Sequence, residues 1–338
     1  MNIDLITGAT GLLGGNLIHT LLKEDRSVRA LVRQSADLQV LQRLPQVEIV
    51  YGDITDPSSL DQAMRGIENV YHCAALTSLW NGRADKIWEI NVNGTHHIIQ
   101  AAIQARVKRL IHCSTVDALG ISETKVPANE ETVWNWDRLG VENPYARSKF
   151  EAQKLVLGAA QSQLDAVIVN PTTMFGAYDL KPSSGQIILL IAGGKLPFYP
   201  VGGDNFVNVE DVASGMVKAA QYGQSGACYI LGHENVTYKD IFDRIATQLN
   251  VSPPRVKIPY QISRIGGWFG DIMGHVTGVE QTINTNTVQL GALDHYYCSK
   301  KAVKELGLTQ SPVDKAIEHA IQWFIEVGKI KGAICRNL

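Results

Sequence analysis

A glycine-rich turn close to residue 1 constrains what this chain can fold into more than any other feature. The apolar run at 3–6 leads into Gly8, Gly11 and Gly14, after which apolar residues recur at helical spacing over 11–24. In such a strand–turn–helix unit, Gly8 permits a tight bend and Gly11 lets backbone amides approach a pyrophosphate. Gly14 allows the helix to pack closely on the strand. The spacing is Gly-x-x-Gly-x-x-Gly, and its place between strand and helix predicts phosphate binding at the helix N-terminus.

Strand and helix patterns alternate through the first half of the chain. Strands are expected at 28–32, 47–51, 69–73, 108–113 and 166–170, and helices at 57–66, 84–105 and 144–161. This alternation predicts an α/β fold, a Rossmann-type doubly wound parallel sheet with helices on both faces. Ligands of such a sheet bind at the carboxyl ends of its strands.

Beyond residue 171 the alternation gives way to segments punctuated by Pro, Gly and Trp, which we interpret as a smaller, mostly C-terminal substrate lobe. The expected dinucleotide-binding domain comprises residues 1–171, 207–232 and 294–306. The expected substrate lobe comprises residues 172–206, 233–293 and 307–338, with an amphipathic closing helix over 312–327.

Composition excludes several classes of function. A net charge of −2 gives no indication of a nucleic-acid partner or an anionic surface. The longest apolar stretch, 262–279, is interrupted by Arg264, Asp271 and His275, so no membrane span is expected. The first strand begins at residue 3, which leaves no room for a signal peptide. The cysteines are scattered, which favours free thiols in a cytoplasmic protein without a metal site: Cys73, Cys113, Cys228, Cys298 and Cys335.

Tyr145 and Lys149 lie four residues apart in a predicted helix that Asn143 can cap and Pro144 can start. The two side chains therefore share one helical face. An ammonium beside a phenol favours phenolate, so we expect a lowered pKa for Tyr145 and a proton donor usable near neutral pH. The same spacing also occurs in ordinary amphipathic surface helices, so it carries weight only together with the rest of the chain.

Hydroxyl and amide side chains add to this constellation. Ser114 and Thr115 follow the strand predicted over 108–113, and either hydroxyl could hold a substrate carbonyl oxygen beside Tyr145. Asn91 falls inside a predicted helix, where its amide could orient a water or a backbone carbonyl, or serve only as a polar residue in the helix.

The second strand ends in Arg33 rather than in an acid. An Asp or Glu there would hold the ribose 2′-hydroxyl of NAD, whereas a guanidinium can pair with a 2′-phosphate. We therefore expect NADP(H), with a solvated arginine as the alternative. Asp53, after the third strand, could accept a hydrogen bond from adenine or cap the helix that starts at Pro57.

Together these motifs resemble the extended short-chain dehydrogenase/reductases, over nearly the whole chain. The matching stretches are the glycine turn, Asn91-Val92-x-Gly94-Thr95, Ser114-Thr115, Tyr145-x-x-x-Lys149, Asn170-Pro171 and 207–213. Within that family, the stretches 28–33 and 229–235 are similar to the dihydroflavonol-4-reductase-like group, whose members are typically NADP(H)-dependent carbonyl reductases.

The resemblance implies roles for individual residues. Thr115 is the implied catalytic hydroxyl, with Ser114 in reserve, and Lys149 is the implied partner of the nicotinamide ribose. The candidate catalytic residues are Thr115, Tyr145, Lys149, Ser114 and Asn91. The candidate cofactor-binding residues are Gly8, Thr10, Gly11, Leu12, Leu13, Gly14, Arg33, Asp53, Ile54, Ala74, Ala75, Tyr145, Lys149 and Pro171. A homodimer through 84–105 and 144–161 would be usual for the family.

The expected activity is NADP(H)-dependent reduction of a small hydrophobic ketone or aldehyde, or oxidation of the corresponding alcohol. A nucleotide-sugar epimerase or dehydratase with tightly bound NAD is the alternative, with Arg244, Arg255 and Arg264 available for a diphosphate. A silent NADP-binding regulator is the third hypothesis, although such proteins usually lose the tyrosine or lysine. Segment 262–279 could be a lid, a helix against the pocket or a subunit contact. Aromatic residues of the variable segments could line the pocket or only fill the core: Trp80, Trp134, Trp136, Phe175, Tyr178, Phe198, Tyr199, Trp268 and Phe269.

Overall fold

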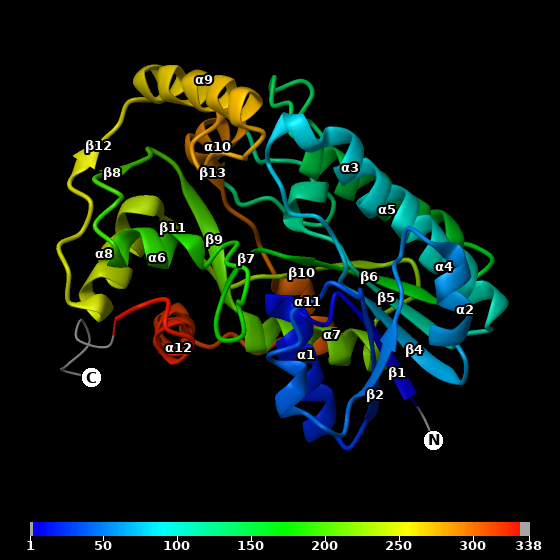
Figure 1. Cartoon of the computed structure of the whole chain (residues 1–338). Helices are drawn as coiled ribbons and strands as arrows, with labels where there is room; N and C mark the ends of the chain where they lie inside the picture. The colour runs from blue at the N-terminus through cyan, green and yellow to red at the C-terminus, as the bar shows by residue number, and fades with distance from the viewer. Residues whose placement is uncertain (1–2, 332–338) are drawn as a thin grey trace.

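The centre of the fold is a seven-stranded sheet in the order β10-β6-β5-β4-β1-β2-β3, and all of its strand pairs are parallel (Figure 1). Its strands are β1 Ile3–Thr7, β2 Ser27–Val32, β3 Glu48–Tyr51, β4 Ile67–His72, β5 Arg109–Cys113, β6 Ala166–Pro171 and β10 Cys228–Leu231. This computed structural model describes residues 3–331 and confirms the predicted Rossmann-type fold. The order of strands reverses between β1 and β4, which is where such sheets bind ligands.

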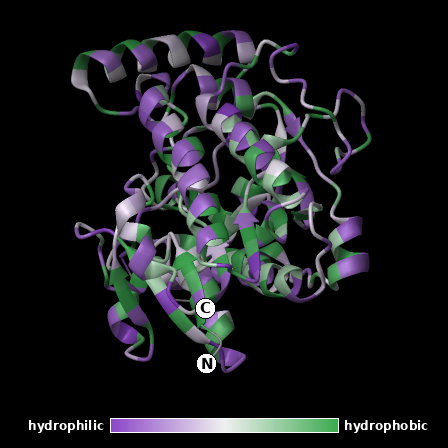
Figure 2. Ribbon diagram, turned by 90° about the vertical axis from the view of Figure 1, so that its right-hand side faces the viewer, coloured by the Kyte–Doolittle hydropathy of each residue, from purple (hydrophilic) through white to green (hydrophobic). Residues whose placement is uncertain are grey.

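Two helical layers bury the sheet. One face carries α1 Leu12–Lys23, α7 Val209–Tyr222 and α11 Lys300–Leu306, and the other carries α2 Leu60–Ala63, α4 Gly94–Gln104 and α5 Pro144–Ala160 (Figure 1). Each layer closes its own apolar core. Because both faces are covered, the middle residues of the strands are mostly apolar and buried, and green ribbon gathers in the interior in Figure 2.

A second, smaller layer lies beyond the carboxyl end of β6. Its central strand, β9 Gly203–Asn208, pairs with β7 Thr173–Phe175, β11 Glu234–Thr237 and β13 Asp294–His295. Three helices enclose its core: α6 Gln186–Ala192, α8 Tyr238–Leu249 and α12 Val313–Glu326. Segment 294–306 contributes to both layers, since β13 pairs with β9 while α11 packs on α7 and β10. The ends of the two expected domains, residues 1–2 and 332–338 with Cys335, lie outside the described residues.

Two further pairs of elements flank the smaller layer. Strands β8 Phe198–Tyr199 and β12 Val256–Lys257 form a short parallel pair. Helices α9 Tyr260–Thr277 and α10 Thr285–Gly291 pack against each other along the top edge of the molecule (Figure 1). Within residues 3–331, no helix combines the length and the apolar character needed to cross a bilayer.

Two predicted helices differ from the structure. The helix expected over 84–105 is divided into α3 Ala84–Trp88, a π-helical turn Glu89–Asn93 and α4. The helix expected over 57–66 is a 3₁₀ turn followed by the four residues of α2, and Gly66 then turns the chain into β4 with φ of +71°. Hydrophobic periodicity does not distinguish a π turn from an α turn, so the interruption carries no sequence signal of that kind.

Candidate active site

The glycine turn brings β1, α1 and the end of β4 into direct contact. Gly8 has φ of +72°, and a Cβ there would lie 2.7 Å from the Ala74 amide nitrogen. A Cβ on Gly14 would lie 2.2 Å from the Gly8 carbonyl oxygen, so Gly14 packs the helix onto the turn itself rather than onto the strand. Gly11 is exposed at the N-cap of α1 and offers no capping side chain. This bare helix end behind a close turn fits a pyrophosphate.

Thr115 directly follows β5 and lies near Tyr145 of α5, and Lys149 binds the carbonyl of Cys113, the last residue of β5. Asn143 caps α5 by accepting a hydrogen bond from the Ala146 amide at 3.1 Å, which sets Tyr145 in the first turn of the helix. The Thr115 hydroxyl faces the Tyr145 phenol closely enough to lower its pKa. Lys149 is 3% exposed, and its Nζ donates to the Cys113 carbonyl at 2.7 Å.

The expected lowering of the Tyr145 pKa is wrong for this structure. Burial raises the pKa of Tyr145, the charges of Asp117 and Cys113 raise it further, and Thr115 opposes them. The Lys149 ammonium is engaged by a backbone carbonyl, and burial lowers its own pKa. A Tyr-x-x-x-Lys spacing places two side chains on one face, but it does not fix which partner the ammonium selects.

The π-helical turn directs Asn91 into the interior. The Asn91 amide bonds both backbone groups of Leu76, accepting from its N–H at 2.7 Å and donating to its carbonyl at 3.1 Å. It also donates to the Ser148 hydroxyl at 2.9 Å, which in turn donates to the Tyr145 carbonyl at 2.7 Å. Asn91 therefore fixes the segment after β4 relative to the start of α5.

A directed chain of hydrogen bonds connects the glycine turn with Asn91. The Ala74 amide donates to the Thr7 hydroxyl at 3.1 Å, and Thr7 lies 2.8 Å from Nδ1 of His72. Nε2 of His72 lies 3.0 Å from the Thr95 hydroxyl, which donates to the Asn91 carbonyl at 2.6 Å. Because the Thr95 hydroxyl already donates its proton to the Asn91 carbonyl, it must accept from His72. Nε2 of His72 is therefore the donor, and Nδ1 accepts from the Thr7 hydroxyl. Burial lowers the pKa of His72 to about 3, which keeps this tautomer neutral.

The other predicted residues differ in their exposure and in their contacts. Arg33 is exposed directly after β2. Asp53 accepts hydrogen bonds from the amide and the hydroxyl of Thr55, and the cap at Pro57 is provided by Asp56 instead. The remaining candidates lie as follows: Thr10, Ala74 and Ala75 half-buried, and Leu12, Leu13, Ile54 and Pro171 buried.

Ser114, the reserve candidate, differs from Thr115 in its contacts. Its Oγ is buried and has no hydrogen-bond partner among residues 3–331, whereas Thr115 meets the phenol. Among the aromatic candidates, Trp136 is fully buried and donates to the Leu119 carbonyl at 2.8 Å, as expected of a core residue. Trp268 and Phe269 instead lie exposed on α9. The cysteines within the described residues are free.

The sequence analysis missed a buried cluster, here called the acidic wall, in which His295 lies beside the carboxyls of Asp117 and Asp204. Asp117 is the member that lies near Tyr145. Nδ1 of His295 lies 3.9 Å from an Asp117 oxygen, and β13 pairs His295 directly with Asp204. Burial raises the pKa of Asp117 to about 6 and that of Asp204 to about 7, while it lowers the pKa of His295 to about 4. Asp117 follows Thr115 by two residues at a strand end, which was the available signal. The other two residues arrive through β9 and β13.

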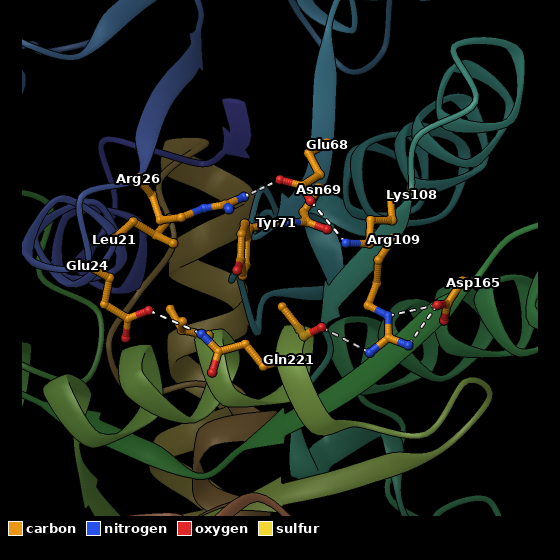
Figure 3. A pocket seen from close by; sticks show the side chains of 12 residues that line it. Leu21, Glu24, Arg26, Glu68, Asn69, Tyr71, Lys108, Arg109, Asp165 and Gln221 are labelled. Carbon is orange, nitrogen blue, oxygen red and sulfur yellow. Dashed lines mark hydrogen bonds and ion pairs between the residues drawn. The ribbon is translucent and has the colours of Figure 1, made fainter. Parts of the chain in front are cut away.

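A charged cleft of about 350 Å³ opens at the opposite, amino end of the sheet (Figure 3). Its charges are paired with one another: Arg26 bonds Asp4 and Glu68, and Arg109 bonds Asp165. The mutual pairing satisfies these groups without a ligand, so the cleft ties together strand ends far from Tyr145.

Known proteins share this sequence and fold. Residues 5–232 match the NAD dependent epimerase/dehydratase family. A Synechocystis sp. protein, named provisionally as a dihydroflavonol 4-reductase, is 35% identical over 331 residues, covering 96% of this chain and 95% of that protein. Sterol demethylase protein B of Methylococcus capsulatus is 32% identical over 329 residues, with 96% and 99% covered. The crystal structure of gox2253 matches with a TM-score of 0.86 at 34% identity, covering 98% of this chain and 100% of that chain.

The family match and the geometry of the glycine turn agree on one assignment. The chain belongs to the NAD-dependent epimerase/dehydratase family, the extended short-chain dehydrogenase/reductases, whose members bind a nicotinamide dinucleotide.

Proposed function

We propose that this protein is an NADP(H)-dependent carbonyl reductase or alcohol dehydrogenase that acts on a hydrophobic ketone, aldehyde or secondary alcohol. The observation that carries the proposal is that three groups gather at the carboxyl end of β5: the Thr115 hydroxyl lies close enough to the Tyr145 phenol to lower its pKa, and the buried Lys149 binds the Cys113 carbonyl at 2.7 Å. Chemistry on an α/β sheet of this kind is performed at that edge.

The residues divide the work of the reaction. The bound dinucleotide supplies or accepts the hydride. Tyr145 donates a proton to the substrate oxygen, and Thr115 holds that oxygen with its hydroxyl. Lys149 is fixed by the Cys113 carbonyl at 2.7 Å, a position suited to holding the nicotinamide ribose. Burial and the charge of Asp117 raise the pKa of Tyr145, so its phenol is protonated at neutral pH and has a proton to donate.

The acidic wall supports an uncharged substrate. A pKa of about 6 leaves Asp117 mostly ionised at neutral pH, and the carboxyl of Asp204, with a pKa of about 7, is about half ionised there. Negative charge beside Tyr145 disfavours a substrate that carries a carboxylate next to its reacting carbon. The name of the Methylococcus relative, a sterol demethylase protein, is consistent with an apolar substrate.

A substrate panel tests the proposed function. Purified protein should oxidise NADPH in the presence of hydrophobic aryl or alkyl ketones, which is measured as a loss of NADPH absorbance. It should not act on sugar nucleotides. Protein that instead retains tightly bound NAD and epimerises a sugar nucleotide would establish the alternative. Protein that binds NADPH without turning over any carbonyl would be a regulator.

Cofactor preference is tested at Arg33, which is exposed directly after β2. Arg33→Ala should weaken NADPH binding about 10- to 100-fold, since charge-assisted hydrogen bonds to the 2′-phosphate are lost. The affinity for NADH should change little. Titration calorimetry with both cofactors measures the difference, and equal losses would show that Arg33 does not read the 2′-phosphate.

A further inference from the structure

Helix α9 buries its glycines and exposes its large apolar side chains, the reverse of the usual arrangement in a water-soluble protein. An amphipathic helix normally turns its large apolar side chains toward the core. Here the buried residues of α9 are the glycines Gly267 and Gly274. The large apolar side chains face solvent, with Trp268 58% exposed and Phe269 56% exposed. The same outer face contains Ile262, Ile265, Ile272, Met273 and Val276, all exposed.

The glycine face is fixed by close contact with the body of the protein. A Cβ on Gly270 would lie 1.8 Å from the Ile283 carbonyl oxygen, and one on Gly267 would lie 3.1 Å from the Asn284 carbonyl oxygen. A Cβ on Gly274 would approach the Trp80 indole nitrogen to 3.1 Å. The helix therefore cannot rotate its large residues inward, and its outward apolar face is a fixed property of the fold.

The segment that leads into α9 and the first half of α9 carry exposed positive charge. Residues 251–270 contain three cations, Arg255, Lys257 and Arg264, and no Asp or Glu, and all three cations are exposed. The nearest acids are turned toward the body instead. Asp271 accepts a hydrogen bond from the Thr285 amide at 3.2 Å, and Glu280 accepts one from the Ser78 hydroxyl at 2.7 Å.

We propose that the outer face of α9 docks flat on an anionic lipid bilayer, as an interfacial helix rather than a span. The 18 residues give a face about 27 Å long. Apolar and aromatic side chains on one side with cations beside them are what the headgroup boundary of a bilayer binds. A second copy of the same face would bring no negative charge to Arg255, Lys257 and Arg264, so charge complementarity favours the lipid surface.

One segment connects α9 with the candidate active site. Segment 76–83, which Asn91 anchors at Leu76, also contacts α9 and α10 through Trp80, Leu79 and Asn286. A hydrophobic substrate could then pass between the bilayer and the candidate active site. This consequence rests on the proposed function, whereas the docking itself does not.

Vesicle co-sedimentation of the full chain tests the docking. The probes are vesicles of phosphatidylcholine alone and of phosphatidylcholine with phosphatidylglycerol. We expect binding to the anionic vesicles and weak binding to the neutral ones. The double variant Trp268→Ser, Phe269→Ser should lose more than about tenfold of that affinity. The double variant Arg255→Gln, Lys257→Gln should lose about fivefold for each charge removed.

Tyr222 provides the matched control, since it is 65% exposed at the end of α7, on the far side of the molecule from α9 (Figure 1). Tyr222→Ser should bind vesicles like the parent protein. Equal binding to both kinds of vesicle would overturn the proposal. So would a parent protein that binds no vesicles but forms dimers that the Trp268→Ser, Phe269→Ser variant loses. Vesicle binding without ketone reduction would refute the proposed function alone.

Discussion

Tyr145→Phe should lower kcat by about 10²- to 10⁴-fold while leaving the affinity for NADPH nearly unchanged. The change removes one hydroxyl, the proton donor that meets Thr115, and keeps the ring that packs at the start of α5. Steady-state kinetics with the best ketone of the panel gives kcat, and calorimetric titration with NADPH gives the affinity. Full activity in this variant would remove Tyr145 from the mechanism.

The neighbouring hydroxyls provide a control for this result. Thr115→Ala should also lose turnover, because Thr115 faces the phenol. Ser114→Ala should retain it, because the Ser114 Oγ has no hydrogen-bond partner within residues 3–331. A reversed pattern, with Ser114 essential and Thr115 dispensable, would show that the substrate oxygen binds elsewhere than proposed.

Gly14→Ala should reduce catalytic efficiency about a hundredfold or more and destabilise the protein by about 3 kcal/mol. The added methyl would lie 2.2 Å from the Gly8 carbonyl oxygen and 2.8 Å from the Ala9 Cα, both of them backbone atoms. Helix α1 must therefore move away from the turn, and the amides at its N-terminus move with it. Thermal unfolding and calorimetric titration with NADPH measure the two effects.

Gly158 is the matched control for Gly14. It lies exposed in α5, and a Cβ there would meet nothing within 4 Å. Gly158→Ala should leave NADPH affinity unchanged and stabilise the protein by about 0.5–1 kcal/mol, the usual gain of replacing a helical glycine. Parent-like NADPH affinity and stability in Gly14→Ala would mean that the turn tolerates displacement of α1.

The fold could be predicted from sequence because its signals are local. The glycine turn, the alternating strands and the N-cap at Asn143 each depend on residues within a few positions of one another. The π-helical turn at Glu89–Asn93 could not, since its hydrophobic pattern is that of a helix. It matters to the site all the same, because Asn91 lies on it.

The site was predictable where one element carries it and not where several meet. Tyr145 and Lys149 follow from a single helix. The strand end offers both Ser114 and Thr115, and the family resemblance favours Thr115. Asp204 and His295 join Asp117 only through the pairing of β9 with β13, and that pairing depends on tertiary structure. The direction of the Tyr145 pKa failed for the same reason, because burial and Asp117 outweigh an ammonium that bonds the Cys113 carbonyl instead.

The glycine face of α9 also bears on how this protein can diverge. The helix contacts the body through Gly267, Gly270 and Gly274, so these positions tolerate little change. Its outer side chains contact the body much less, and exchanging them costs the fold correspondingly little free energy. Substitutions on the outer face of α9 could therefore change which surface this protein binds in the cell, while the residues around Tyr145 stay unchanged.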